Sequence, residues 1–383
     1  MALRLETQRK VLVVILAVAA IACASVLEAT KTFRRTRGYT EKRAAVDAAQ
    51  KAYDALRDYY QGDLGRRINL GNDPASTGLI GPQGTAFQNA AGNVAAKRTS
   101  INPNFAAVIV EYFQELGLGR GDLVAVGLSG SYPGTNVNVF AAIEAMGLQP
   151  IVITAVGASG WGATDPDFTW LDMERILSER GIFKTRSIAA SPGGSDDMGG
   201  SKSGEEKELI WRAIQRNHVP EIRARSLDES IKKRMELIYA EARGNPIKAY
   251  VNVGGASASL GFDIADVPIA SGLHRDLASW PVNWPREGPM IQFAKRGAPV
   301  INLGALQGIA RDYGLSIAPK SMPPVPEGTA LGKKGYSLPV SAIVLVLYVL
   351  LTLFLTLPTW RRLVMRQEAS APGSVTTPPA QAG

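Results

Sequence analysis

The sequence predicts an α/β domain with a mostly parallel sheet and helices on both faces, flanked by an N-terminal and a C-terminal transmembrane helix. Two observations support this class. Short apolar strand patterns alternate with helical patterns along the middle of the chain. An uncharged hydrophobic run lies near each end. The predicted division is a membrane anchor over 1–37, the α/β domain over 38–332, and a second span with a disordered tail over 333–383.

The first hydrophobic run covers residues 11–27. At about 1.5 Å per residue, it just spans a hydrocarbon core of roughly 30 Å. The same shape is typical of a signal peptide, here with small residues at 22–24 as a cleavage site. Cys23 also loosely fits a lipoprotein acylation site. We expect an uncleaved anchor, with cleavage and acylation as the alternatives.

The second hydrophobic run covers residues 338–357. Tyr336 and Trp360 lie at its two ends, where amphipathic rings favour the membrane interface. A buried core helix is the alternative, but core helices seldom run this long without a polar face. The charges around this run favour a cytoplasmic C-terminus, whereas those around the first run point weakly the other way. We expect the domain to lie outside the cytoplasm.

The distribution of charge argues against a nucleic-acid partner. The whole chain carries a net charge of +8, but residues 1–37 hold +5 and residues 333–383 hold +4. The intervening 38–332 segment is close to neutral, at about −1. Positive charge beside a bilayer helix meets anionic lipid, whereas a DNA-binding domain needs basic residues clustered on its folded surface. The single cysteine excludes an intramolecular disulfide.

Periodicity predicts the elements between the two anchors. A helix over 41–61 is either a stalk leading from the membrane or the first packing helix of the domain, and the pattern leaves both open. Residues 69–99 are predicted to form a long loop, and 319–326 a Pro-rich linker. The remaining predictions are helices over 105–116, 137–146, 170–179, 205–215, 226–242 and 290–295, and strands over 123–127, 150–155, 187–190, 249–253 and 299–303.

Several predicted strands end in loops rich in glycine and serine. The carboxyl ends of strands in an open α/β sheet line its ligand crevice, and glycine lets a ligand approach the backbone. Short strand-to-helix turns also require glycine, so no single loop identifies a site. The set predicts one polar pocket suited to carboxylates or phosphates. The predicted ligand-binding residues are Ser129, Ser131, Asn136, Ser159, Trp161, Thr164, Asp165, Ser195, Asp196, Asp197, Gly254, Gly255, Ser257 and Asn302.

A serine hydrolase is the alternative function. The run from Gly127 to Ser131 nearly reproduces a nucleophile elbow, with Ser129 as the nucleophile. His274 lies downstream as the base, and Asp263 or Asp266 could orient it. The helix predicted after Ser129 starts only at residue 137, which spoils the tight elbow. We therefore leave open whether the chain is an enzyme; as an enzyme it would cleave amide or ester bonds.

No cofactor is expected, because the glycine spacings match neither a dinucleotide fingerprint nor a phosphate-binding P-loop. Asp165, Asp167, Asp196 and Asp197 could bind a hard cation through oxygen. Aspartate is also a routine turn and cap residue, and that interpretation is favoured here. No metal site is therefore predicted.

The loop sequences resemble the poly-gamma-glutamate system protein family, which is membrane-anchored and encoded beside the bacterial machinery that makes or exports poly-γ-glutamate. The resemblance rests on GLSGSYPGTN (127–136), VGASGWGATDPDFTWLDME (156–174), SPGGSDDMGG (191–200) and VNVGGASASLG (251–261), together with the anchors. It covers most of residues 1–360.

This resemblance implies an accessory role in capsule-type polymer synthesis or export at a bacterial cell membrane. The implied partners are the membrane, synthase subunits, the polymer, or a combination of these. No active-site residues are transferred by it. Because the domain is nearly neutral, any attraction of a polyanion would have to be local. A purely structural assembly subunit remains the third hypothesis.

Overall fold

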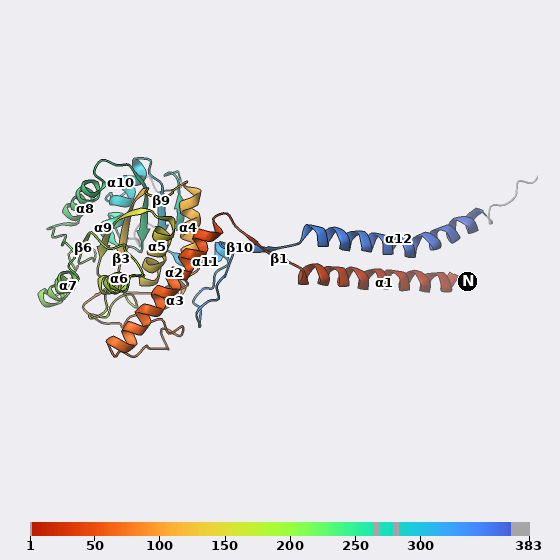
Figure 1. Cartoon of the computed structure of the whole chain (residues 1–383), viewed down its shortest axis with the longest axis horizontal. Coiled ribbons are helices and arrows are strands. Elements are labelled where there is room, and N and C mark those ends of the chain that lie inside the picture. Colours follow the sequence, from red (N-terminus) through yellow and green to blue (C-terminus); the bar gives the residue numbers. More distant parts are fainter. Residues whose placement is uncertain (1, 264–268, 279, 281–282, 369–383) are drawn as a thin grey trace, which may run out of the picture. The chain divides into compact units, whose positions relative to one another are not determined.

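The computed structural model describes residues 2–263, 269–278, 280 and 283–368. It divides into two units, Met1–Arg34 with Lys333–Gly383, and Arg35–Gly332 (Figure 1). The division falls close to the predicted boundaries of the α/β domain. Asp266 and the tail beyond Glu368 lie outside the described residues.

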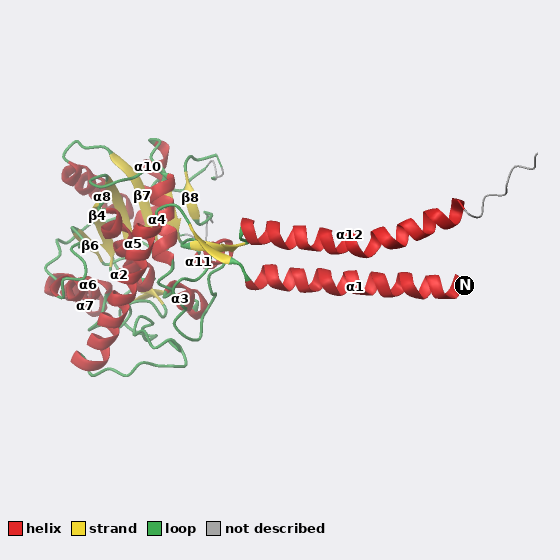
Figure 2. Cartoon of the chain, turned by 45° about the vertical axis from the view of Figure 1, so that its right-hand side comes forward, coloured by secondary structure: helices red, strands yellow, loops and turns green. Residues whose placement is uncertain are grey.

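The first unit contains the helices α1 (Ala2–Ala29) and α12 (Leu338–Glu368), which run side by side (Figure 2). Their apolar segments, Lys10–Ala29 and Leu338–Leu357, each have a mean hydropathy of 2.7 and are not buried within the protein. Both are therefore long and apolar enough to cross a membrane. The short strands β1 (Thr32–Arg35) and β10 (Gly332–Gly335) pair with each other.

The second unit is built on a six-stranded sheet with the order β6-β4-β3-β7-β9-β8. Five of the strands are parallel and β8 is antiparallel to β9. The predicted mixed α/β class with a largely parallel sheet is therefore confirmed. The strands are β3 (Leu123–Ser129), β4 (Gln149–Ala155), β6 (Ala189–Ser191), β7 (Ile247–Val253), β8 (Gly272–His274) and β9 (Val300–Leu303).

The chain reverses its direction across this sheet between β3 and β7. From β3 it moves outward to β4 and β6, then returns to place β7 on the other side of β3. It next forms β8 at the far edge, and β9 then fills the position between β7 and β8. Such a reversal opens a crevice at the carboxyl ends of the two central strands, where doubly wound sheets bind ligands. The strand order thus places the switch point at Ser129 and Val253, the last residues of β3 and β7.

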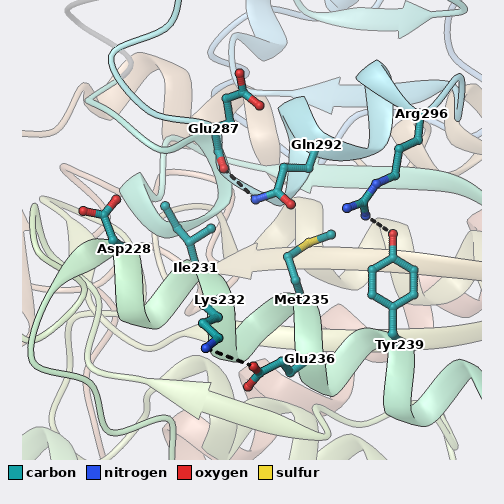
Figure 3. Close-up of a pocket in the computed structure, with 9 residues that line it drawn as sticks. All are labelled: Asp228, Ile231, Lys232, Met235, Glu236, Tyr239, Glu287, Gln292 and Arg296. Atoms are coloured by element: carbon teal, nitrogen blue, oxygen red, sulfur yellow. Dashed lines mark hydrogen bonds and ion pairs between the residues drawn. The ribbon is translucent and has the colours of Figure 1, made fainter.

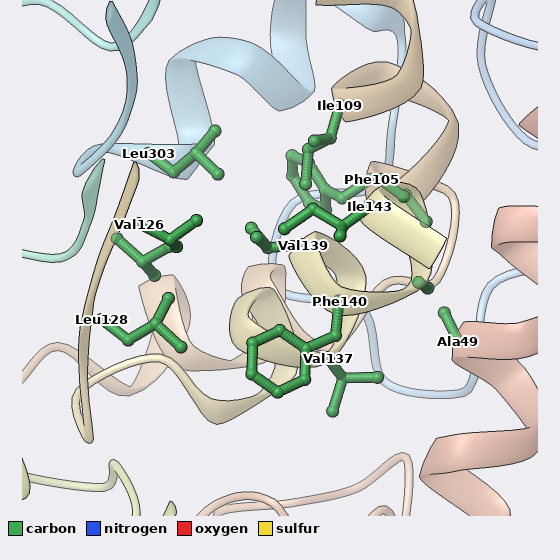
Figure 4. Packing of buried hydrophobic residues seen from close by; sticks show 14 of the residues in the cluster. Ala49, Phe105, Ile109, Val126, Leu128, Val137, Val139, Phe140, Ile143 and Leu303 are labelled. Carbon is green, nitrogen blue, oxygen red and sulfur yellow. The ribbon is translucent and has the colours of Figure 1, made fainter. Parts of the chain in front are cut away.

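Successive side chains of the strands point to opposite faces of the sheet and belong to two hydrophobic clusters, one on each face. On one face, Val126 and Leu128 of β3 point toward Val139 and Phe140 of the helix that follows (Figure 4). On the other face, Ala125 of the same strand joins a separate cluster from β7 and the later helices. Both faces are therefore buried, as the continuous apolar strand sequences require.

The long helices agree with the periodicity, with one shift that matters for the site. The bounds of α4 and α6 agree with the predicted ranges 105–116 and 170–179 to within a residue. The helix α5, however, starts at Pro133 and not at residue 137. Proline suits a first helical position because its fixed φ is already helical. The bounds are α4 (Phe105–Glu115), α5 (Pro133–Met146), α6 (Trp170–Glu179), α7 (Gly204–Arg216), α8 (Leu227–Ala242) and α10 (Pro289–Lys295).

The helix α2 (Tyr39–Asp58) belongs to the domain core. Its residues Val46, Ala49 and Leu56 are completely buried, and it packs against α4 and α5. This decides between the two interpretations of the 41–61 pattern in favour of a packing helix. A π-helical turn, η1 (Tyr59–Asp63), follows it.

The predicted loop over 69–99 is wrong in part, because it contains β2 (Gln88–Ala90) and most of α3 (Val94–Ser100). Among the described residues, six other short elements were not predicted, and they are β1, β10, β5 (Ala158–Ser159), α9 (Ser257–Leu260), α11 (Leu306–Tyr313) and the antiparallel β8. Elements this short owe their stability to tertiary contacts and carry little periodicity of their own.

Candidate functional site at the carboxyl edge of the sheet

The loops that follow the parallel strands gather at one edge of the sheet. Backbone hydrogen bonds join successive strand ends: Gly130 N donates to Ala155 O (3.0 Å), and Val156 N donates to Ser191 O (2.9 Å). Gly254 N donates to Leu303 O (3.3 Å) on the other side. The predicted convergence of the glycine- and serine-rich loops is therefore present.

Ser129 lies at the switch point between β3 and β7. Its hydroxyl donates to Val253 O at 3.2 Å, and the side chain is only 2% exposed. Gly254 has a φ of +80°, and a Cβ there would lie 2.5 Å from Ser129 Oγ. Glycine is thus required both by the backbone conformation and by the close approach to the serine. Asn136 of α5 donates from Nδ2 to Ser129 O (3.0 Å), which fixes the strand end from the helix side.

A buried lysine that the sequence analysis did not identify joins two of these loops. Lys97 of α3 donates from Nζ to Ser159 Oγ at 2.6 Å and to the carbonyl oxygen of Ser131. The same ammonium lies 4.1 Å from the ring centroid of Tyr132. Ser159 N in turn donates to Ser131 Oγ at 3.0 Å. The lysine was missed because residues 69–99 were assigned to a loop; the helix cap formed by Asn93 was the available signal.

Burial lowers the pKa of Lys97 to about 7. Within the part of the chain that the structure describes, no charged group contributes to this shift. Lys42 is equally buried, at 2% exposure, but its Nζ lies 2.7 Å from Glu111 Oε2. The two lysines are equally buried but differ in their partners. Lys42 is paired with a carboxylate, whereas Lys97 contacts a hydroxyl, a carbonyl oxygen and an aromatic ring.

The segment between Gly81 and Lys97 covers part of the edge. β2 and β5 pair in parallel, with Ala158 N donating to Phe87 O at 2.9 Å. Thr164, one of the predicted ligand-binding residues, is fully buried beneath this segment and donates to Pro82 O. Trp161 remains partly exposed beside it and has a φ of +61°, which is strained for a bulky side chain.

The three predicted aspartates form structural contacts. Asp197 is 1% exposed and forms an ion pair with Arg234 (3.0 Å). Asp196 closes a turn by accepting from Gly200 N at 2.8 Å. Asp165 accepts from Tyr60 Oη at 3.3 Å and from Asp167 N at 3.0 Å. Among the residues that the structure describes, no group of His, Cys, Asp and Glu side chains could hold a metal ion.

The predicted residues therefore divide into two sets by exposure. Those that remain at least partly open to solvent are Ser131, Ser159, Trp161, Ser195, Asp196 and Gly255. Those that are buried are Ser129, Asn136, Thr164, Asp165, Asp197, Gly254, Ser257 and Asn302. The buried Asn302 accepts from Asn252 Nδ2 at 3.0 Å and so links β9 to β7. The open set spans the loops after β3, β4, β6 and β7, and a ligand at this edge would meet these six residues first.

The structure contradicts the hypothesis that His274 serves Ser129. His274 lies on the edge strand β8 and pairs with Val300 of β9, which puts it at the level of Ala125 in β3. Ser129 and His274 are therefore separated by three strand spacings, about 14 Å, and by about 13 Å along the strands. The Nε2 atom of His274 lies 2.8 Å from Ala270 O. Ser129 and His274 therefore do not form a catalytic pair. Asp263 lies in the loop after α9, and Asp266 lies outside the described residues.

A separate open groove lies between α8 and α10 (Figure 3). Its volume is about 540 Å³, and its charged side chains are largely engaged with neighbours, as for Arg296, which donates to Tyr239 Oη. Gln292 donates to Glu287 O at 2.8 Å. The groove is lined by residues of α8, α10 and the segment before α10, and none of the predicted ligand-binding residues contributes to it.

No family model and no curated protein matches the chain. Among solved structures, an archaeal alanine:glyoxylate aminotransferase is similar at 10% identity with a TM-score of 0.15. The similarity covers 76% of this chain and 57% of the length of that protein. At this TM-score the likeness carries no argument about fold or function.

Proposed function

We propose that this chain is a membrane-anchored accessory component of poly-γ-glutamate synthesis or export. In this proposal it binds the polymer or a synthase subunit at the carboxyl edge of its sheet. The supporting observation is that three loops, distant in sequence, present Ser131, Ser159, Trp161 and Ser195 at one edge beside the topological switch point. The polymer itself is suggested by the resemblance of these loop sequences.

The chemistry of the edge suits a carboxylate ligand. Serine hydroxyls and backbone N–H groups donate hydrogen bonds to carboxylate oxygens. Lys97 lies beneath the edge, and Lys202 donates from Nζ to Gln88 O (2.7 Å) beside it. A carboxylate bound nearby would favour the charged form of Lys97 and be attracted by it. Binding would then be local, as a nearly neutral domain requires.

The two apolar helices would hold the domain at the membrane, with both chain ends on the same side. We place the domain on the extracytoplasmic side of a bacterial cell membrane, because the charges after the second span favour a cytoplasmic C-terminus. At that position the carboxyl edge could meet a polymer as it leaves the synthase.

Calorimetric titration of the full chain in lipid nanodiscs tests polymer binding. A γ-linked glutamate oligomer should release heat at millimolar concentration or below, and an α-linked oligomer of the same length should bind less tightly. Trp161→Ala should weaken binding roughly tenfold, about 1.4 kcal/mol, because it removes a partly exposed aromatic contact. Tyr239→Ala, in the α8–α10 groove, is the matched control and should bind like the wild type.

Absence of heat from the γ-linked oligomer would contradict polymer binding. If Tyr239→Ala weakened binding as much as Trp161→Ala is expected to, the ligand would instead lie in the α8–α10 groove. A synthase partner predicts a different result: synthase subunits co-purify with the wild type but not with Trp161→Ala.

A further inference from the structure

Ser159 and Lys97 are in hydrogen-bond contact at the carboxyl edge, although they are 62 positions apart in the chain. Their Oγ and Nζ atoms lie 2.6 Å apart, which is within the range over which a general base takes a proton from a hydroxyl. Ser159 is half-buried and Lys97 is buried, so the hydroxyl is the member of the pair that a ligand can reach. A serine nucleophile backed by a lysine base has this arrangement.

A lysine acts as a base only in its neutral form, and the surroundings of Lys97 favour that form. Burial disfavours the charged amine, and the groups that contact Lys97 Nζ are the Ser159 hydroxyl, the Ser131 carbonyl oxygen and the Tyr132 ring. The buried Lys42 shows the opposite arrangement, because Glu111 stabilises its charge. The difference between the two sites is therefore the absence of a carboxylate beside Lys97, within the described residues.

The groups that face Lys97 would not restore its charge. Tyr132 is the titratable group against the ammonium, and burial raises the pKa of its hydroxyl, so it stays neutral at neutral pH. The helices α5 and α11 pack against α3. The charged residues of these two helices are engaged elsewhere or exposed: Glu144 accepts from Thr185 N at 2.8 Å, and Arg311 and Asp312 are exposed.

The loop that carries Ser159 is held by backbone contacts with the loop after β3, and a catalytic arrangement requires such support. Ser131 Oγ accepts from Ser159 N at 3.0 Å, which fixes the backbone of the nucleophile. A Cβ at Gly162 would lie 2.6 Å from Gly130 O, so the two loops touch through their backbones. Trp161, between these contacts, keeps its strained conformation two residues after Ser159. Strain of this kind persists where the surroundings over-determine it, often at functional sites.

We propose that Ser159 and Lys97 form a nucleophile–base pair that cleaves an ester or amide bond by acyl transfer. Neutral Lys97 takes the proton from Ser159 Oγ as that oxygen bonds to the carbonyl carbon. The tetrahedral intermediate then collapses, and the alcohol or amine leaves with the proton from Lys97. Water, deprotonated by the same lysine, attacks the acyl-serine. The lysine then returns that proton to Ser159 Oγ as the Oγ–acyl bond breaks and a carboxylic acid is released. This activity goes beyond the proposed binding role and uses neither Ser129 nor His274.

A fluorophosphonate probe on the full chain in detergent tests the proposal. Mass spectrometry should find the adduct on Ser159, with a rate that rises with pH and is half-maximal near pH 7, as Lys97 loses its proton. Ser159→Ala should give no adduct at that position. Lys97→Arg keeps a hydrogen-bonding cation but cannot act as a base, and should slow labelling by about 10²- to 10⁴-fold.

Two matched variants serve as controls. Ser178→Ala removes a serine of similar exposure on α6, and Lys42→Arg changes a lysine of equal burial; both should label like the wild type. No adduct on Ser159 between about pH 6 and pH 9 would overturn the proposal, as would an unchanged rate in Lys97→Arg. If that variant does not fold, the pH profile of the wild type decides, because a rate without an inflection near pH 7 also overturns it.

Discussion

Asp197 and Arg234 form an ion pair that is almost completely removed from solvent, at 1% and 3% exposure. Arg234 also donates to Ser191 Oγ, and Ser230 Oγ donates to the same aspartate. The network ties the loop after β6 to α8. Removing one member leaves an uncompensated buried charge, so Arg234→Met should lower the free energy of unfolding by about 3–5 kcal/mol. Urea denaturation followed by circular dichroism measures it.

The exposed pair of Lys232 and Glu236 on the same helix provides the control. Its atoms are 3.8 Å apart at the surface, where such pairs contribute about 0–1 kcal/mol. Lys232→Met should therefore change stability little. Equal effects of the two substitutions would show that the buried network does not stabilise the domain.

Glu174 predicts a pH dependence of stability. It is fully buried, and desolvation raises its pKa to about 7, despite hydrogen bonds from Ser187 and an Arg186 guanidinium 3.7 Å away. Between the unfolded value near 4.5 and this folded value, the native state binds the extra proton. Stability contributed by protonated Glu174 is thus present at low pH and is lost as pH rises toward 7.

The glutamine variant separates this effect from the other titrations of the chain. Glu174→Gln should remove a decrease of up to about 3 kcal/mol between pH 4.5 and pH 7.5. Unfolding free energies of both proteins across that range measure it. Parallel pH profiles for the wild type and the variant would contradict the assignment.

Residue-scale features were predictable from the sequence only where they follow a strand. Ser131 and Ser159 were identified because they lie in glycine-rich loops after β3 and β4. Lys97 was not, because its position beside them depends on how the 81–97 segment folds over the sheet, and nothing local encodes that contact. Asp197 was identified as a ligand-binding residue, but its ion pair depends on the placement of α8.

At the scale of elements, α2 distinguishes a stalk from a packing helix. Leu56 is completely buried near its end. Leu56→Ala should therefore cost about 2–5 kcal/mol of unfolding free energy, as for other truncations of buried leucine. Lys51→Ala, at an exposed position of the same helix, should change it by less than about 0.5 kcal/mol. A negligible effect of the leucine substitution would contradict the packing of α2 in the domain core.

Length explains which elements the sequence could predict. The helices α4, α6 and α8 each carry several turns of periodic apolar residues, and their predicted bounds agree closely with the structure. The elements β2 and β8 have three residues each, and such short patterns cannot be distinguished from loops. The early start of α5 at Pro133 was missed because Pro133 and Gly134 were assigned to the glycine-rich loop after β3.

For the whole molecule, the two candidate spans predict a testable topology. With Cys23 replaced by serine, a cysteine at the exposed Ser195 should react with a membrane-impermeant maleimide in intact bacterial cells. A cysteine at position 374 of the tail should react only after permeabilisation. Reaction of both positions in intact cells would contradict a pair of spans with both ends in the cytoplasm.

The alternation of strands and helices was sufficient to predict the parallel sheet, but not the order of its strands. That order places the switch point between β3 and β7 and moves His274 to the far edge. The order of Ser129, Asp263 and His274 along the chain therefore suggested a catalytic set, but the strand order puts Ser129 and His274 on strands that are not neighbours. Strand order depends on crossover connections, which the sequence pattern of single elements does not specify.

Hydrogen–deuterium exchange of the full chain in nanodiscs, with and without a γ-linked glutamate oligomer, tests the central claim most directly. The account predicts slower exchange in four loops at once, over residues 130–132, 159–161, 194–196 and 254–256, with no change over 228–239 on α8. Protection confined to α8, or no protection anywhere in the presence of bound oligomer, would contradict a ligand site at the carboxyl edge of the sheet.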